Sequence, residues 1–192
     1  MRITKIILLL PFLVLFSCTT PSYVFKRPGQ TGLDFTEGKW LLHTVDNKYL
    51  NEKALKDFTA FTGSRLSETA TTSGLLLVNN IPLQPNRQLL TDLYNGTGYD
   101  YYINIKDVVY QDDIAAVEIG NNLLRPEASS GVTIEVYDLK NKNIIYAQTV
   151  VGSTQKTPNA TGDVNFYKPA AGLVIGSYNR IIKDIRSKSK VK

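Results

Sequence analysis

Two β-rich segments separated by only four residues constrain the fold of this chain more than any other feature. The runs VTIEVYD and NIIYAQTVV are joined by LKNK. Both runs are rich in β-branched and aromatic side chains, which favour strands. Because the connection is so short, it predicts an antiparallel hairpin with strands at residues 132–138 and 144–150.

Three further strands are predicted upstream of this hairpin. Residues 99–109 alternate, which places Tyr101, Ile103 and Ile105 on one face of a strand and Tyr102 on the other. Residues 40–45 form a short apolar run. Residues 75–78 are continuously apolar between turn-forming residues, which is typical of a strand buried on both faces.

Apolar residues at helical spacing predict three helices. The first has Asn51 as its N-cap, the second covers residues 86–96 and ends at Gly96, and the third starts near Lys168 with Pro169 in its first turn. The element order is β-α-β-α-β-β-β-α, and right-handed crossovers make the first three strands parallel neighbours. The predicted fold class is α+β, with a single mixed β-sheet of about five strands packed against about three helices.

The lone cysteine, Cys18, decides where we expect the protein to reside. It follows Arg2, Lys5 and the apolar run IILLLPFLVLF, which is too short for a transmembrane helix and fits the core of a secretory signal. The sequence LFSC resembles the processing box of bacterial lipoproteins. This resemblance implies a signal peptide over residues 1–17, cleavage before Cys18, and acylation of the Cys18 thiol and amine.

Residues 18–38 are rich in Thr, Pro, Gly and Ser and are predicted to be a flexible tether between the lipid and a single domain at residues 39–187. A basic tail follows at 188–192. Resemblance to lipoprotein sorting rules implies the inner leaflet of an outer membrane, facing the periplasm, and leaves surface exposure open. The mature chain keeps 20 of the 22 basic residues against 17 acidic ones, and its C-terminal positive charge is interpreted as a solvated helix end, not a nucleic-acid site.

Part of the chain resembles a known envelope domain. Residues 99–105, 132–140 and 144–152 follow the pattern of a strand entered through "D-Y", a strand ending in "YDLK" and a return strand closing with Gly. This pattern resembles the domain shared by the TolB N-terminal region, the curli-secretion lipoprotein and the lipoprotein activators of penicillin-binding proteins. The resemblance implies an accessory role in an envelope assembly. The insert at 111–131 departs from the pattern, and its role stays open.

No catalytic pattern is present, so we expect no enzyme, no cofactor and no metal site. His43 is the only histidine and has no partner at ligand spacing. The sequence is rich in tyrosine, and Tyr102 and Tyr110 are candidates for contact with a protein partner. We therefore expect an adaptor or scaffold anchored to the membrane by lipid, of undetermined oligomeric state. The alternative is a small-ligand or glycan-binding lipoprotein, or an unrecognised hydrolase, with a pocket around residues such as His43, Asp100 and Asp112.

Overall fold

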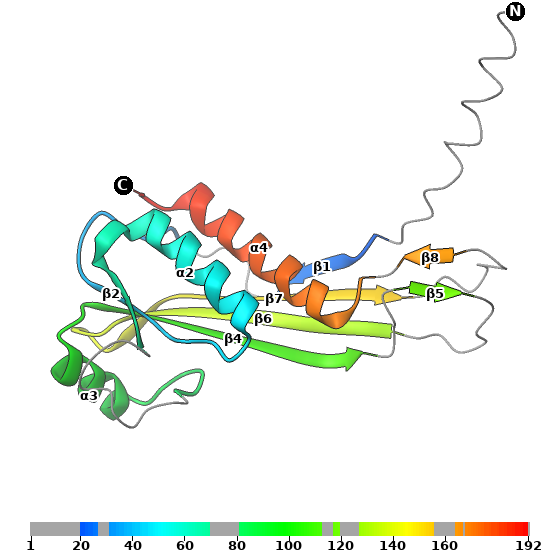
Figure 1. The fold of residues 1–192 in the computed structure, drawn as a ribbon. Coiled ribbons are helices and arrows are strands. Elements are labelled where there is room, and N and C mark those ends of the chain that lie inside the picture. Colours follow the sequence, from blue (N-terminus) through cyan, green and yellow to red (C-terminus); the bar gives the residue numbers. More distant parts are fainter. Residues whose placement is uncertain are drawn as a thin grey trace, which may run out of the picture.

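A six-stranded mixed sheet organises the protein (Figure 1). The computed structural model describes residues 20–26, 31–69, 81–112, 117–119, 127–155, 164–166 and 168–191, with the backbone alone at 117–119 and 164–166. The strand order is β1-β7-β6-β4-β2-β3, and three α-helices pack on the sheet in the described part of the chain. The fold class is α+β, as predicted, and two of the six strands, β1 (Ser22–Phe25) and β3 (Leu66–Glu68), lie outside the predicted strand ranges.

Three long antiparallel strands form the centre of the sheet. β6 (Glu127–Asp138) and β7 (Asn143–Gln155) are the predicted hairpin, and β4 (Tyr101–Asp112) pairs with β6 on its other side. In the hairpin turn, the Asp138 carboxylate accepts a hydrogen bond from the backbone N–H of Asn141 (2.9 Å). All three strands are longer than their predicted ranges.

The parallel part of the sheet is built around β2 (Trp40–Leu42). This strand lies parallel to β4 and to β3 (Leu66–Glu68), and α2 (Lys48–Thr62) with the short 3-10 helix η2 (Gly63–Arg65) connects β2 to β3. The predicted parallel pairing of the first strand with residues 99–109 is confirmed. The predicted strand at 75–78 lies outside the described residues.

Helix α2 begins earlier than the sequence suggested. Its N-cap is Asn47, whose side chain accepts a hydrogen bond from the N–H of Leu50 (3.1 Å), and not Asn51. The side-chain amide oxygen of Asn51 instead accepts a hydrogen bond from the N–H of Val45 (2.8 Å). β2 ends at Leu42, three residues before the predicted strand end. Both asparagines therefore fix the transition from strand to helix.

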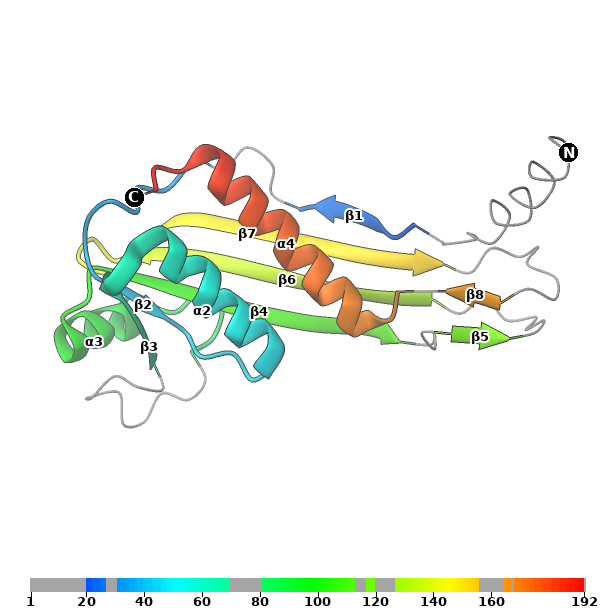
Figure 2. The same cartoon turned by 45° about the horizontal axis from the view of Figure 1, so that its top comes forward.

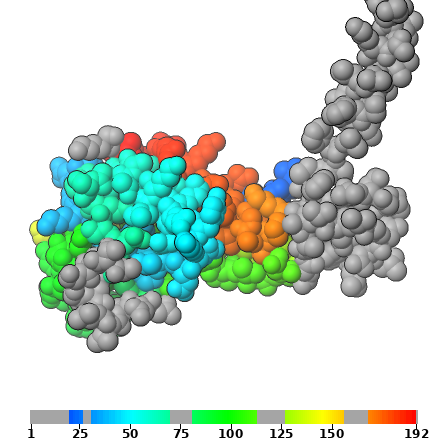
Figure 3. Space-filling view, in the orientation of Figure 1, coloured from blue at the N-terminus to red at the C-terminus, as the bar shows by residue number. Residues whose placement is uncertain are grey.

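Helices cover the two faces of the sheet unequally. Helices α2 and α4 (Ala170–Lys188) pack on one face, as Figures 2 and 3 show, and form the main core with residues such as Phe58, Tyr178, Ile103 and Val136. Helix α3 (Arg87–Thr97) lies on the opposite face, at one end only (Figure 1). There it forms a smaller core of buried residues: Leu41, Ile81, Leu90, Leu93, Tyr102, Tyr137 and Leu139. Gly98, in the left-handed conformation (φ 67°), ends this helix two residues after the predicted stop.

The prediction that residues 18–38 form a tether with few contacts is wrong for the part that is described. β1 pairs antiparallel with β7, and its Tyr23 side chain enters a slot between two glycines. A Cβ at Gly152 would lie 2.8 Å from the Tyr23 ring, and one at Gly176 would overlap the Tyr23 hydroxyl. We call this feature the Tyr23 slot. The two glycines leave room for the Tyr23 ring between β7 and α4, and the ring holds β1 against the domain.

Residues 31–38 also belong to the domain. Leu33 and Phe35 are buried in the main core, and Phe35 packs on Trp40 with a ring-centroid distance of 4.7 Å. The backbone of Lys190 bonds to both of them: its carbonyl accepts from the Phe35 N–H and its N–H donates to the Leu33 carbonyl (both 2.9 Å). This part of the predicted basic tail is therefore paired with the chain, and the domain begins before residue 39.

The predicted insert at 111–131 contains ordered strand structure. β4 and β6 extend into it, and β5 (Val117–Ile119) pairs antiparallel with β8 (Val164–Phe166) in a separate two-stranded sheet. This small sheet lies beyond the ends of β4 and β6, away from α3 (Figure 2).

Candidate functional site

In the part of the chain that the structure describes, the sheet face that carries α3 is covered by a helix at one end only (Figure 1). Near α3, Tyr102 on β4 and Tyr137 on β6 are buried beneath the helix. Further along the same face, no described helix lies over β4, β6, β7 and β1 (Figure 1). Antiparallel sheets usually pack one face on the core and can leave the other open to solvent. A contiguous apolar patch on an open face marks an interaction site, whereas single exposed apolar residues are common and need no explanation.

A row of apolar residues crosses this uncovered half. The strand register aligns Val108 with Gly131, Gly131 with Val151, and Val151 with Val24, so the row runs across four strands. The two outer valines are exposed, Val108 by 45% and Val24 by 53%. We call these four residues the apolar row.

Tyr110 lies over the centre of the apolar row. It is the extra residue of a β-bulge in β4, and its ring would be 3.4 Å from a Cβ placed on Gly131. The glycine leaves space that the aromatic ring fills, as in other sheets where a ring covers a strand glycine. Tyr110 is nevertheless 59% exposed. The ring therefore adds an exposed aromatic group to the aliphatic side chains of the apolar row.

Hydroxyl side chains border the apolar row on both sides. On one side Thr133 and Thr149 share a hydrogen bond between their hydroxyl oxygens (2.9 Å), and on the other Ser22 and Ser153 do the same (2.8 Å). These cross-strand pairs fix the side chains at the border of the row. A hydrophobic centre with a polar rim is the usual anatomy of a protein–protein contact.

The outer edge of β4 beside the apolar row is also exposed. All five residues from Val108 to Asp112 are solvent-exposed, and Val109, which points to the other face, is 54% exposed. No described strand pairs with the outer side of this segment. Unpaired strand edges with apolar side chains are places where another chain can add a strand.

The two tyrosine candidates have different outcomes. Tyr102 is fully buried under α3, so it is wrong as a surface contact. Tyr110 is exposed and belongs to the uncovered surface, and its contact with a partner remains a prediction. The valines of the apolar row were not identified from the sequence, because the alternation of a strand does not tell which half of a face a distant helix will cover.

The three polar residues considered for a pocket each lie in a different structural setting. His43 is buried, and burial lowers the pKa of its imidazole to about 4. The Asp100 carboxylate accepts from the Lys39 N–H (2.8 Å), and the Asp112 carboxylate accepts from the Ala170 N–H at the start of α4 (3.1 Å). Asp112 thus caps α4, which begins after Pro169 and receives no side-chain cap from it.

One carboxylate is buried at the covered end of the same face. Glu135 is 1% exposed, and its oxygen accepts hydrogen bonds from the Gln84 N–H (2.9 Å) and the Tyr137 hydroxyl (2.6 Å). These bonds hold the segment before α3, in which Gln84 has a positive φ of 53°. Glu135 therefore has a structural role in supporting α3. Within the described residues, no group of three or more His, Cys, Asp or Glu side chains is arranged to bind a metal.

The membrane-related predictions lie largely beyond the described residues. Cys18 and the predicted signal peptide fall outside them. Among the helices that are described, none is long and apolar enough to cross a membrane.

Comparisons with known proteins identify only distant structural neighbours. No protein-family profile and no curated protein matches the sequence. Among solved structures, a PelC dodecamer from Paraburkholderia phytofirmans is similar with 9% identity and a TM-score of 0.37, covering 90% of this chain and 100% of that chain. A point variant of that dodecamer is similar with 8% identity and a TM-score of 0.38, covering 89% of this chain and 100% of its own. Similarity at this level establishes no family for the chain.

Proposed function

We propose that this protein is a lipid-anchored, periplasm-facing accessory protein of the outer membrane that acts as an adaptor in an envelope assembly. The observation that carries the proposal is the apolar row with Tyr110 above it, because it is an exposed apolar surface on an otherwise well-packed sheet. The occupant would be an envelope protein that presents apolar side chains to this surface. The lipoprotein box ending at Cys18 supplies the location.

The position of β1 supports an adaptor held close to the membrane. Ser22, the start of β1, comes four positions after Cys18. These four steps span at most about 14 Å, because an extended chain covers about 3.3–3.6 Å per residue. An anchor this short raises the effective concentration of the domain for a neighbour in the same membrane.

Site-specific crosslinking in the native envelope tests the partner surface. A photoreactive residue at position 108 should give one dominant adduct with another envelope protein, and Tyr110→Ser should strongly reduce that adduct. Tyr49→Ser is the matched control, because Tyr49 is an equally exposed tyrosine (65%) on α2, away from the row. A crosslink to a second copy of this chain would contradict the adaptor proposal and indicate self-association through the apolar row.

Lipid anchoring is tested separately. Metabolic labelling with palmitate should mark the wild type and not Cys18→Ala, and the variant should be released from the membrane. Persistent labelling of Cys18→Ala would contradict the anchoring. For the crosslinking experiment, if a photoreactive residue at position 49 gave the same adducts as one at position 108, the apolar row would not be the contact surface.

A further inference from the structure

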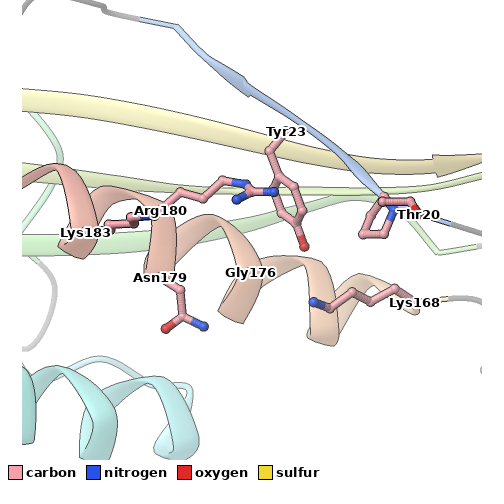
Figure 4. Close-up of a pocket in the computed structure, with 8 residues that line it drawn as sticks. Thr20, Tyr23, Lys168, Gly176, Asn179, Arg180 and Lys183 are labelled. Atoms are coloured by element: carbon pink, nitrogen blue, oxygen red, sulfur yellow. The ribbon is translucent and has the colours of Figure 1, made fainter.

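A groove with three positive charges lies between β1 and α4. Its cavity volume is about 360 Å³. Its lining includes Arg180 and Lys183 from α4, Lys168 just before α4, and Tyr23 from β1 (Figure 4). Thr20 and Pro21, just before β1, complete this part of the lining. We call it the basic groove. It is distinct from the apolar row, because α4 packs on the opposite face of the sheet.

The cations of the basic groove are not neutralised by the described protein. No described carboxylate forms an ion pair with Lys168, Arg180 or Lys183. Asp184 lines an adjoining hollow, but its carboxylate is engaged with Lys188 Nζ (2.7 Å). The groove therefore has a net positive charge that an anionic ligand could balance.

The aromatic ring of Tyr23 arranges these cations. The Arg180 guanidinium lies 3.9 Å from the ring centroid, and the Lys168 ammonium lies 5.9 Å from it. In Figure 4 the two side chains reach toward the Tyr23 ring from opposite ends of the groove. The ring restricts the guanidinium, and no hydrogen bond from its N–H groups is found to any described residue. A planar set of donors suits a phosphate better than a mobile ammonium does.

The basic groove lies beside the predicted lipid anchor. Thr20, in its wall, is two residues from Cys18. Two extended residues span about 7 Å, so an acylated Cys18 would place this wall within the headgroup layer of the membrane. Clusters of positive charge next to a membrane anchor attract anionic lipids, and each Lys or Arg near the surface contributes about 1 kcal/mol to membrane binding.

We infer that the basic groove binds the phosphate of an anionic phospholipid headgroup and thereby docks the β1–α4 side of the domain on the membrane. This inference rests on the proposed lipid anchoring. Arg180 contacts the phosphate through its free N–H groups, and Lys168 and Lys183 add charge from either side. Docking on this side leaves the apolar row, on the opposite face of the sheet, free for a protein partner.

A fluorescence experiment on the lipidated full-length protein tests this inference. Asn179 is an exposed, uncharged residue of the groove wall, and Asn179→Cys introduces the one free thiol, because the chain has a single cysteine that lipidation would block. The thiol carries a fluorophore, and the vesicles carry a quencher on their headgroups. We expect strong quenching in vesicles that contain phosphatidylglycerol, and weak quenching in phosphatidylcholine alone.

Charge variants separate the groove from general attraction. Lys168→Gln with Lys183→Gln should lower the docking equilibrium by about fivefold per cation, roughly 25-fold together. Arg180 is left intact because it stacks on Tyr23. Lys48→Gln with Lys140→Gln removes the same charge from α2 and the β6–β7 turn, and should change docking less than twofold. Both pairs should keep the melting temperature of the parent.

Three results would overturn the inference. They are equal quenching in the two kinds of vesicle, equal loss in both charge variants, and suppression of quenching by millimolar inorganic phosphate, which would indicate a site for free anions. Flotation of the vesicles distinguishes the two proposals. A protein that floats without quenching contradicts only the groove, whereas a protein that does not float contradicts the lipid anchor.

Discussion

Substitution of Gly176 by alanine tests how the N-terminal segment is held on the domain. In most helices this change stabilises the fold by about 0.5–1 kcal/mol, because alanine has the higher helix propensity. At Gly176 the new Cβ would overlap the Tyr23 hydroxyl, so the ring must leave the Tyr23 slot. Gly96 in α3 is the matched control, since nothing lies within 4 Å of a Cβ at that position.

The expected magnitude follows from what Tyr23 loses on leaving the slot. Full burial of a large side chain contributes about 1.5–3 kcal/mol, so the partly buried Tyr23 contributes about 1–2 kcal/mol, and the contact with Arg180 adds about 0.5–1 kcal/mol. Subtracting the gain in helix propensity, Gly176→Ala should lower the free energy of unfolding by about 1.5 kcal/mol. In a Tyr23→Ala background the same substitution should instead stabilise, which makes the coupling energy of the pair about 2–3 kcal/mol.

Urea denaturation of the four proteins of this double-mutant cycle measures the coupling. Gly96→Ala should raise the unfolding midpoint, and Gly176→Ala should lower it. Tyr23→Phe should leave the midpoint unchanged or higher, because the buried Tyr23 hydroxyl has no hydrogen-bond partner among the described residues. The reasoning is refuted if Gly176→Ala stabilises as Gly96→Ala does, or if the two substitutions are additive within about 0.5 kcal/mol.

Three further predictions concern single polar residues. Burial lowers the pKa of His43 in the folded state to about 4, below its ordinary 6.5, so the unfolded chain binds the proton first as the pH falls. The free energy of unfolding should therefore fall by about 2 kcal/mol from pH 7 to pH 5. Chemical denaturation of His43→Gln should show a flatter dependence on pH. Glu135→Ala should cost about 2–3 kcal/mol in urea denaturation, because the Gln84 N–H and the Tyr137 hydroxyl lose their acceptor, whereas Glu135→Gln should cost less. Asp112→Ala should lower stability by about 1 kcal/mol and speed amide exchange in the first turn of α4, and Asp112→Asn should retain most of the cap.

The central hairpin could be predicted from sequence because its determinants are local. Alternating side chains and a short turn define β6 and β7, and the same alternation placed Tyr101 and Ile103 correctly toward the main core. Local patterns were less informative about caps. Asn47 and Asn51 are four residues apart, and both suit an N-cap. Their hydrogen bonds distinguish them: the Asn47 side chain accepts from the Leu50 N–H and caps the helix, whereas the Asn51 side chain accepts from the Val45 N–H.

The two tyrosine candidates show where sequence reasoning ended for the site. Alternation along β4 places Tyr102 and Tyr110 on the same face of the sheet, and the structure agrees. Their exposures differ because α3 covers one end of that face and no described helix covers the other. The position of α3 depends on contacts between residues far apart in the sequence, such as the hydrogen bond from the Gln84 N–H to Glu135. The residues next to either tyrosine in the sequence therefore do not show whether a helix covers it.

The Tyr23 slot limits how far the domain could move from the proposed lipid anchor. A free tether over residues 18–38 would extend about 70 Å and let the domain rotate in any direction. The slot requires Gly152 and Gly176, both more than 120 residues beyond Tyr23, which is why the composition of the N-terminal segment alone suggested a linker. With β1 paired to β7, the proposed anchor at Cys18 would be joined to one defined edge of the sheet by a link of at most about 14 Å. An adaptor needs such a link, because a contact surface aids assembly only when it meets its partner in a restricted orientation.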